Sequence, residues 1–234
     1  MPSAMEEFHF TGQDDALEHI VARERPLVIR GLVKDWPLVT AAAQSDTAFA
    51  RMLASFDNGT PVDALVMPAS EEGVIGYSAD GSGFNFDHHR ASVSQGLDKL
   101  LKLADRDAPG VAMQSAPIAA CLPGLLEQHA VPFLGEQIKP RIWIGNRVTT
   151  PAHFDEYHNV ACVVCGVRRF TLFAPEQIGN LYIGPLDYAP TGAAISMARL
   201  DRPDDPRYPR LRLALESAIV ADLEPGDAIY IPPM

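Results

Sequence analysis

The sequence is poor in cysteine and has no long apolar run. Its 234 residues include three cysteines, Cys121, Cys162 and Cys165, and an odd number in a chain of this length argues against a disulfide framework. No apolar stretch approaches the roughly 20 residues that a membrane-spanning helix needs. Residues 1–15 carry acidic side chains and lack the apolar core of a signal peptide. We therefore expect a cytoplasmic protein without a membrane segment.

The sequence also has fewer basic than acidic residues. Lysine and arginine total 19 against 30 aspartates and glutamates, which gives a formal net charge of -11. An acidic surface repels nucleic-acid phosphates unless a basic patch offsets it. The one basic cluster that stands out is interleaved with aspartates and consists of Arg199, Arg202, Arg207, Arg210 and Arg212. Such interleaving is typical of a solvated surface, so we expect no nucleic-acid partner.

The composition is that of a globular protein, with 47% apolar and 21% charged residues. In the first part of the chain, apolar periodicity predicts helices at 15–21, 47–56 and 94–104 and a buried strand at 26–31.

The second half has short runs rich in β-branched and aromatic residues, at 141–145, 159–165, 168–173, 218–223 and 228–231. Gly166 separates the second run from the third and favours a hairpin there. Residues 175–181 fit one helical turn, and 224–227 fit a tight turn. Short strands at close spacing predict a mainly β fold, a sandwich or barrel, with flanking helices.

The segment 149–155 carries the most informative chemistry. Side chains two apart on a strand share a face, so His153 and Asp155 would project together. An imidazole and a carboxylate are two thirds of the facial triad of non-haem iron(II) oxygenases. On its own, His-x-Asp occurs by chance in many proteins, and an exposed polar pair near a strand end is the alternative.

The residues around this motif resemble the JmjC/cupin-like oxygenase family. The likeness is to its bacterial cupin-like branch, which is related to the asparaginyl hydroxylase of hypoxia-inducible factor. The matching residues lie at 150–156, Asn159, Gly166, 168–177, 181–182 and 184–187. Further matches lie at 26–37, 83–86, 113–117, 140–146 and 223–233.

This resemblance implies a double-stranded β-helix (jelly roll) in a single domain over 1–234. Residues 1–110 would supply helical and strand elements that pack on the barrel, and 111–234 its core. It also implies an iron(II)- and 2-oxoglutarate-dependent dioxygenase that hydroxylates a protein or peptide side chain or a small molecule. A homodimer is compatible with it.

The resemblance assigns site residues by position. The metal ligands would be His153 and Asp155, with a third ligand, a histidine, expected after Met234. The residues at co-substrate positions are Thr150, Asn159 and Arg168, and Gln114 falls at a substrate-contact position.

Two departures from the family pattern affect the co-substrate site. Arg168 stands where the asparaginyl hydroxylase has a lysine, and Ala112 stands where relatives often have a tyrosine. These departures favour the alternative of a catalytically inactive cupin-like binding module. A sugar- or small-molecule-binding cupin is a third reading, which the motif at 150–155 opposes.

Two other patterns could also bind metal. Cys162 and Cys165 form a C-x-x-C, but no second ligand pair follows at a zinc-like spacing. Residues three apart on a strand face opposite sides, so we predict that both cysteines are structural. Adjacent His88 and His89 would likewise point apart, which favours surface or pocket-rim roles.

Overall fold

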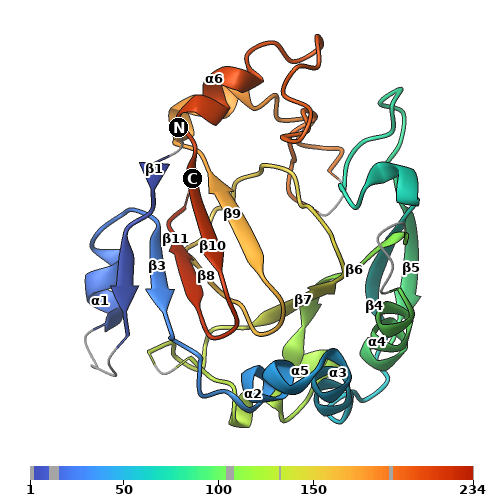
Figure 1. The fold of residues 1–234 in the computed structure, drawn as a ribbon, viewed down its shortest axis with the longest axis vertical. Coiled ribbons are helices and arrows are strands. Elements are labelled where there is room, and N and C mark those ends of the chain that lie inside the picture. The colour runs from blue at the N-terminus through green and yellow to red at the C-terminus, as the bar shows by residue number, and fades with distance from the viewer. Residues whose placement is uncertain (1–2, 11–15, 104–107, 132, 190–191, 234) are drawn as a thin grey trace.

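The computed structural model describes residues 3–10, 16–103, 108–131, 133–189 and 192–233, and its strands form three sheets (Figure 1). The first has the order β1 (Ser3–Ala4), β10 (Ile219–Leu223), β9 (Arg168–Leu172). The second has the order β2 (Glu7–His9), β3 (Leu27–Arg30), β11 (Ala228–Ile231), β8 (Asn159–Cys162). The third has the order β5 (Asp87–Ala91), β4 (Val62–Met67), β6 (Gly110–Pro117), β7 (Arg141–Gly145).

Most strand pairs are antiparallel, and only β1–β10 and β2–β3 are parallel among those described. The longer helices are α2 (Pro37–Gln44), α3 (Asp46–Ala54) and α4 (Val93–Lys102). The shorter ones are α1 (Ala16–Val21), α5 (Ile118–Cys121) and α6 (Leu211–Glu216), with 3-10 turns η1 (Ala69–Glu71), η2 (Leu125–Glu127) and η3 (Pro175–Asn180). None of the described helices is long and apolar enough to cross a membrane.

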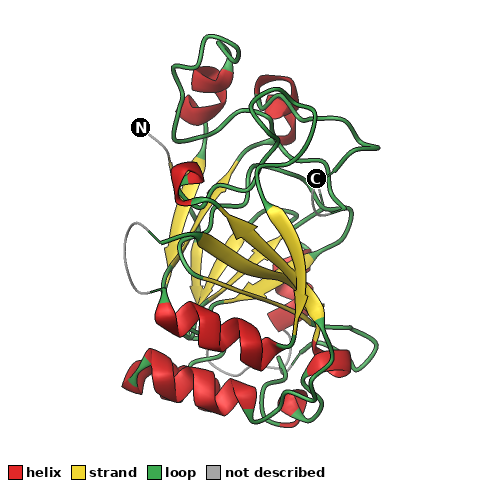
Figure 2. Cartoon of the chain, turned by 90° about the vertical axis from the view of Figure 1, so that its right-hand side faces the viewer, coloured by secondary structure: helices red, strands yellow, loops and turns green. Residues whose placement is uncertain are grey.

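Helices cover one face of the third sheet (Figure 2). Residues of β4 alternate between its two faces. Val62 and Ala64 are buried among residues of α3 and α4, such as Leu53 and Leu97. Leu65 belongs to a different cluster on the opposite face. The start of α4 is stabilised by a capping box between Ser92 and Gln95. The sheet therefore has one face covered by helices, and on its other face β4 packs against a separate apolar cluster.

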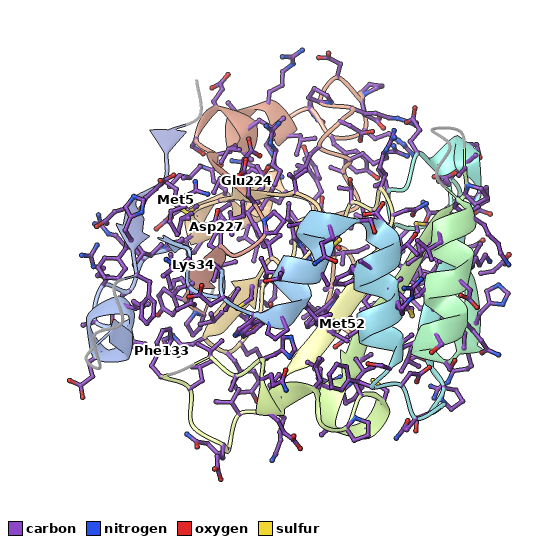
Figure 3. All side chains as sticks on the ribbon, turned by 60° about the horizontal axis from the view of Figure 1, so that its bottom comes forward. Met5, Lys34, Met52, Phe133, Glu224 and Asp227 are labelled. Carbon is purple, nitrogen blue, oxygen red and sulfur yellow. The ribbon has the colours of Figure 1, made fainter. Side chains whose placement is uncertain are left out.

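The centre of the second sheet is fully buried. Val28, Ile29 and Ile229 are fully buried, with apolar clusters on both faces of the sheet. The turn after β10 packs on the chain that follows β3, and Figure 3 shows its residues Glu224 and Asp227 beside Lys34. The carboxylate of Asp227 accepts hydrogen bonds from the backbone N–H of Gly31 and from the guanidinium of Arg30.

The observed elements confirm most of the expected ones. The helices expected at 15–21, 47–56 and 94–104 correspond to α1, α3 and α4, although residues 15 and 104 lie outside the described part. The strands, the turn at 224–227 and the 3-10 turn at 175–180 are also present. The mixture of β-sheets with flanking helices is therefore confirmed. Within the described residues the three sheets stay separate, so the expected double-stranded β-helix is not closed.

The hairpin expected around Gly166 is wrong. β8 pairs with β11 and β9 pairs with β10, so the two runs lie in different sheets. The strand expected at 159–165 also ends early, at Cys162, because the next residue, Val163, forms its backbone hydrogen bonds with the tight turn at residues 224–227. The N–H of Val163 donates to the carbonyl of Asp227, and the N–H of Gly226 donates to the carbonyl of Val163. Long-range pairing thus overrides the local turn signal of Gly166.

Candidate functional site

Residues 149–155, here called the motif segment, have their backbone held between two other parts of the chain. The N–H of Thr149 donates to the carbonyl of Gly73 at 2.9 Å, and its carbonyl accepts from the N–H of Ile75. Further on, His153 forms an isolated antiparallel bridge with Ile195. The segment was expected to be a strand, and it has these isolated bridges in place of a continuous ladder. It is fixed on both sides without being part of a named sheet.

The imidazole of His153 is oriented by the carbonyl of Pro151. Its Nδ1 lies 2.8 Å from that oxygen. A carbonyl can only accept, so Nδ1 must carry the proton and donate it. In the neutral ring this leaves the lone pair on Nε2, which is the form that binds a metal. His153 is exposed, so the free nitrogen is accessible.

The carboxylate of Asp155 is oriented by the side chain of Asn159. The amide Nδ2 of Asn159 donates to Asp155 Oδ2 at 3.0 Å and to the carbonyl of Tyr157 at 3.2 Å. Asp155 is exposed and takes part in no ion pair among the described residues. Its negative charge is therefore left for a cation to neutralise.

Every residue that the sequence assigned to the site lines one large open cavity of about 3460 Å³. These residues are Gln114, Thr150, His153, Asp155, Asn159 and Arg168. They come from three different regions of the chain, namely β6, the motif segment with the start of β8, and the start of β9. Their presence in the lining of one cavity does not test their individual roles, which stay predictions.

Arg168 brings an isolated positive charge to this cavity. Its guanidinium lies 5.2 Å from the centre of the Phe170 ring and has no ion pair with any described carboxylate. Although water reaches the side chain, desolvation by the surrounding protein lowers its pKa. The adjacent Arg169 is fully paired, with two hydrogen bonds to Asp222 at 2.7 Å. An unpaired guanidinium fits an anionic ligand.

The other candidate ligands, which also include residues of the cavity lining, have contacts of their own. Cys162 packs in one apolar cluster and Cys165 in another, and both are unbridged. Burial raises the pKa of Cys162 to about 12, so it stays a thiol at neutral pH. His158 Nδ1 lies 2.8 Å from the hydroxyl of the buried Tyr230. Of the adjacent histidines, His88 lines the cavity.

Sequence reasoning missed a bulge beside Gln114. The register of β6 on β7 shifts between Met113 and Ala116, and Ser115 has a positive φ of 49°. Arg141 holds this conformation by donating to the Ser115 carbonyl at 2.7 Å. A bulge changes where the neighbouring side chains point. No local sequence signal marks it, because it arises from the pairing of two distant strands.

The donor set has the chemistry of a divalent transition-metal site. An imidazole with a free Nε2 and an unpaired carboxylate are ligands that iron(II) accepts, and they fit two of the three protein positions of a facial triad. Among the described residues, no group of three or more histidine, cysteine, aspartate or glutamate side chains is arranged to hold a metal. The molecule is thus a protein of mixed sheets and helices in which the exposed side chains of His153 and Asp155 line the same cavity.

The chain belongs to the cupin-like domain family, whose model matches residues 13–234. It is similar to JmjC domain-containing protein F of Dictyostelium discoideum, with 28% identity over 178 residues, 58% of this chain and 38% of that protein. Lysine-specific demethylase JMJ31 of Arabidopsis thaliana is 32% identical over 91 residues, 38% of this chain and 16% of that protein. tRNA wybutosine-synthesizing protein 5 of Danio rerio is 29% identical over 152 residues, 62% of this chain and 42% of that protein. The chain spans less than half the length of each of these relatives.

Proposed function

We propose that the protein is an iron(II)- and 2-oxoglutarate-dependent dioxygenase that hydroxylates a protein or peptide side chain or a small molecule. The observation that carries this proposal is the state of the His153 and Asp155 side chains. Each is oriented by a hydrogen bond to one atom and has another atom free on the wall of the same cavity. Membership of the cupin-like family and the similarity to JmjC proteins support the same class of activity.

In this proposal His153 Nε2 and a carboxylate oxygen of Asp155 would hold the iron, which would supply oxidising chemistry when 2-oxoglutarate and oxygen are bound. Asn159 keeps the Asp155 carboxylate in position through its amide. Arg168 and Thr150 would bind the distal carboxylate of 2-oxoglutarate. A guanidinium can form two parallel hydrogen bonds with such a group.

A specific observation favours the alternative of a cupin-like binding module without turnover. Ala112, which stands where relatives often have a tyrosine, is 2% exposed and lies opposite Gly145 across the sheet. The position of Ala112 therefore offers no hydroxyl to a bound carboxylate. Formation of succinate from 2-oxoglutarate in the presence of iron(II) and oxygen would support the enzyme, and ligand binding without succinate would support the binding module.

We call His153 and Asp155 the metal pair. Their binding of a metal is tested directly with manganese(II), a redox-stable substitute for iron(II). Electron paramagnetic resonance distinguishes free from bound Mn(II) during a titration. We expect His153→Ala and Asp155→Ala each to weaken binding at least about tenfold, because each removes one of two protein donors. His89→Ala is the matched control, since His89 is exposed on β5 and does not line the cavity. Equal Mn(II) affinity in all four proteins would contradict the assignment.

A further inference from the structure

Two loops beside the candidate site are joined by hydrogen bonds and aromatic contacts. In the first loop, Tyr77 and Phe84 form an antiparallel bridge, and the N–H of Ser78 donates to the carbonyl of Gly83 at 2.8 Å. The second loop follows Leu181 and reaches Tyr188. The hydroxyl of Tyr77 donates to the carbonyl of Tyr188 at 2.9 Å, which links the two loops.

The link depends on a close approach at Gly184. A Cβ atom at this position would lie 2.6 Å from the hydroxyl oxygen of Tyr77, so a larger residue would push the tyrosine away. The hydroxyl of Tyr188 also donates back to the carbonyl of Ser82 at 3.3 Å. The loops are therefore held together by hydrogen bonds in both directions and by packing.

Three aromatic rings lie nearly parallel across this junction. Phe86 and Phe84 have their ring centres 5.4 Å apart with an angle of 3° between their planes. Phe84 and Tyr188 are 4.8 Å apart with an angle of 17°. We call Phe84, Phe86 and Tyr188 the aromatic stack. Its last ring, Tyr188, is 40% exposed, and the nearby Leu186 is 76% exposed. Tyr188 and Leu186 thus present apolar surface to the solvent beside the stack.

The aromatic stack adjoins the metal pair through one residue. Ile195 is the bridge partner of His153. The same Ile195 is buried in an apolar cluster against which Phe86 and Tyr77 pack. The inner end of the stack, Phe86, is thus connected to His153 through one apolar cluster.

Carboxylates without a cationic partner lie in the same segments of the chain as the stack. Asp80, Asp87 and Asp187, here called the rim carboxylates, are exposed and form no ion pair among the described residues. Hydrogen bonds from Ser78 and Ser82 lower the pKa of Asp80 to about 2, so it is ionised at neutral pH. By contrast, the acidic residues near the arginine cluster are paired, as Asp201 is with Arg199 and Asp205 with Arg207.

We propose that the aromatic stack and the rim carboxylates form a docking surface for a lysine- or arginine-bearing segment of a protein partner. An aromatic face attracts a cation through its quadrupole, and the rim carboxylates add charge complementarity. The net charge of -11 favours the same partner and repels nucleic acid. The inference rests on the proposed function in one respect, since the docked segment would be the substrate that reaches His153.

The test is peptide binding without metal or 2-oxoglutarate, so its failure is distinguishable from failure of the proposed function. The probe is a short fluorescein-labelled peptide of alternating glycine and arginine, followed by fluorescence anisotropy. We expect Tyr188→Leu to weaken binding roughly two- to fivefold, as for an exposed cation–π contact. Tyr188→Phe keeps the ring and should bind like the parent protein.

The charge contribution has its own matched pair of variants. Asp187→Asn should weaken binding and reduce its dependence on salt. Glu127→Gln makes the same change in charge on η2, at an exposed residue, and should leave binding unchanged. Equal affinities in all variants would overturn the proposal, as would equal binding of a glycine–glutamate peptide or tighter binding of a single-stranded oligonucleotide. Thermal unfolding of each variant checks that the fold is retained.

Discussion

At the scale of single residues, the candidate site depends on atoms that orient the ligand side chains. His153 is set by the carbonyl of Pro151, and Asp155 is set by the amide of Asn159. The identity of these four residues follows from a local motif, so sequence alone could point to them. Their hydrogen bonds could not be predicted, because the chain leaves the strand geometry between 154 and 158.

Gln114 illustrates the limit of residue-level prediction. Its place on the cavity wall was expected, but the bulge next to it was not. Ser115 adopts a left-handed backbone conformation, which residues other than glycine rarely do. Arg141, 26 positions later in the chain, stabilises that conformation. A contact between two such distant residues leaves no local signal.

At the residue scale, we predict that Arg168 contributes to the binding of 2-oxoglutarate. We expect Arg168→Ala to weaken 2-oxoglutarate binding roughly tenfold or more, since a charge-assisted hydrogen bond contributes about 1.5–3 kcal/mol. Arg168→Lys should recover part of the loss because it keeps the charge. Isothermal titration calorimetry of 2-oxoglutarate measures both. Arg169→Ala is the control, because that side chain pairs with Asp222 instead. An unchanged affinity in Arg168→Ala would show that another residue binds the carboxylate.

At the scale of elements, local signals predicted many of the helices and strands, but they missed α2, β4 and β6 and predicted pairing poorly. The capping box of α4 and the apolar run of β3 each involve only a few consecutive residues, so the local sequence is enough to predict them. The partner of β8 is β11, about 70 residues further along the chain. Pairing at that distance is decided by the shared apolar core on both faces of the second sheet. Gly166 therefore formed a turn, with a φ of 69°, but no hairpin.

The turn between β10 and β11 carries a second prediction. Burial of the Asp227 carboxylate raises its pKa, but hydrogen bonds from Gly31, Arg30 and Glu224 outweigh burial and leave the pKa lowered. In Asp227→Asn the new NH2 group would face the donor groups of Arg30 and Glu224. We expect a loss of about 1–3 kcal/mol in the free energy of unfolding at pH 7, measured by urea denaturation.

The pH dependence provides the check on this explanation. Because the pKa of Asp227 is lower in the folded state, its ionised form stabilises the fold above about pH 4, the unfolded-state value. That contribution is lost as the pH falls through the folded-state pKa. The difference between the parent and Asp227→Asn should therefore shrink in acid. Asp222→Asn, at an exposed ion pair, should cost little at any pH. A difference that stays constant down to pH 3 would contradict the explanation.

At the scale of the whole molecule, three sheets contribute to one cavity. β7 and β8 are the end strands of the two four-stranded sheets, and β9 ends the three-stranded one. All three carry residues that line the cavity, including Trp143, Asn159 and Arg168. The family match over 13–234 supports a jelly roll, and composition and strand spacing predicted sheets with flanking helices. The arrangement of the sheets was beyond sequence reasoning, because it depends on pairing over long separations.

The last prediction concerns the third metal ligand. His153 and Asp155 supply two protein donors, and a facial triad needs three. The family resemblance predicts a histidine among residues that would follow Met234. We expect iron(II) to bind weakly to residues 1–234, and to bind far more tightly to a chain that continues through that histidine. The three chains to compare are residues 1–234, the extended chain, and the extended chain with that histidine replaced by alanine.

Iron(II) affinity and succinate formation are measured for all three chains under anaerobic and aerobic conditions respectively. The prediction holds if only the extended chain with its histidine binds tightly and forms succinate. Tight binding and turnover by residues 1–234 alone would place the third ligand within the present sequence and refute it. If the extended chain folds, as judged by a cooperative unfolding transition, but binds no iron, the cupin-like binding module becomes the better account, because the His153 and Asp155 donors would then lack a metal even with a complete set of ligands.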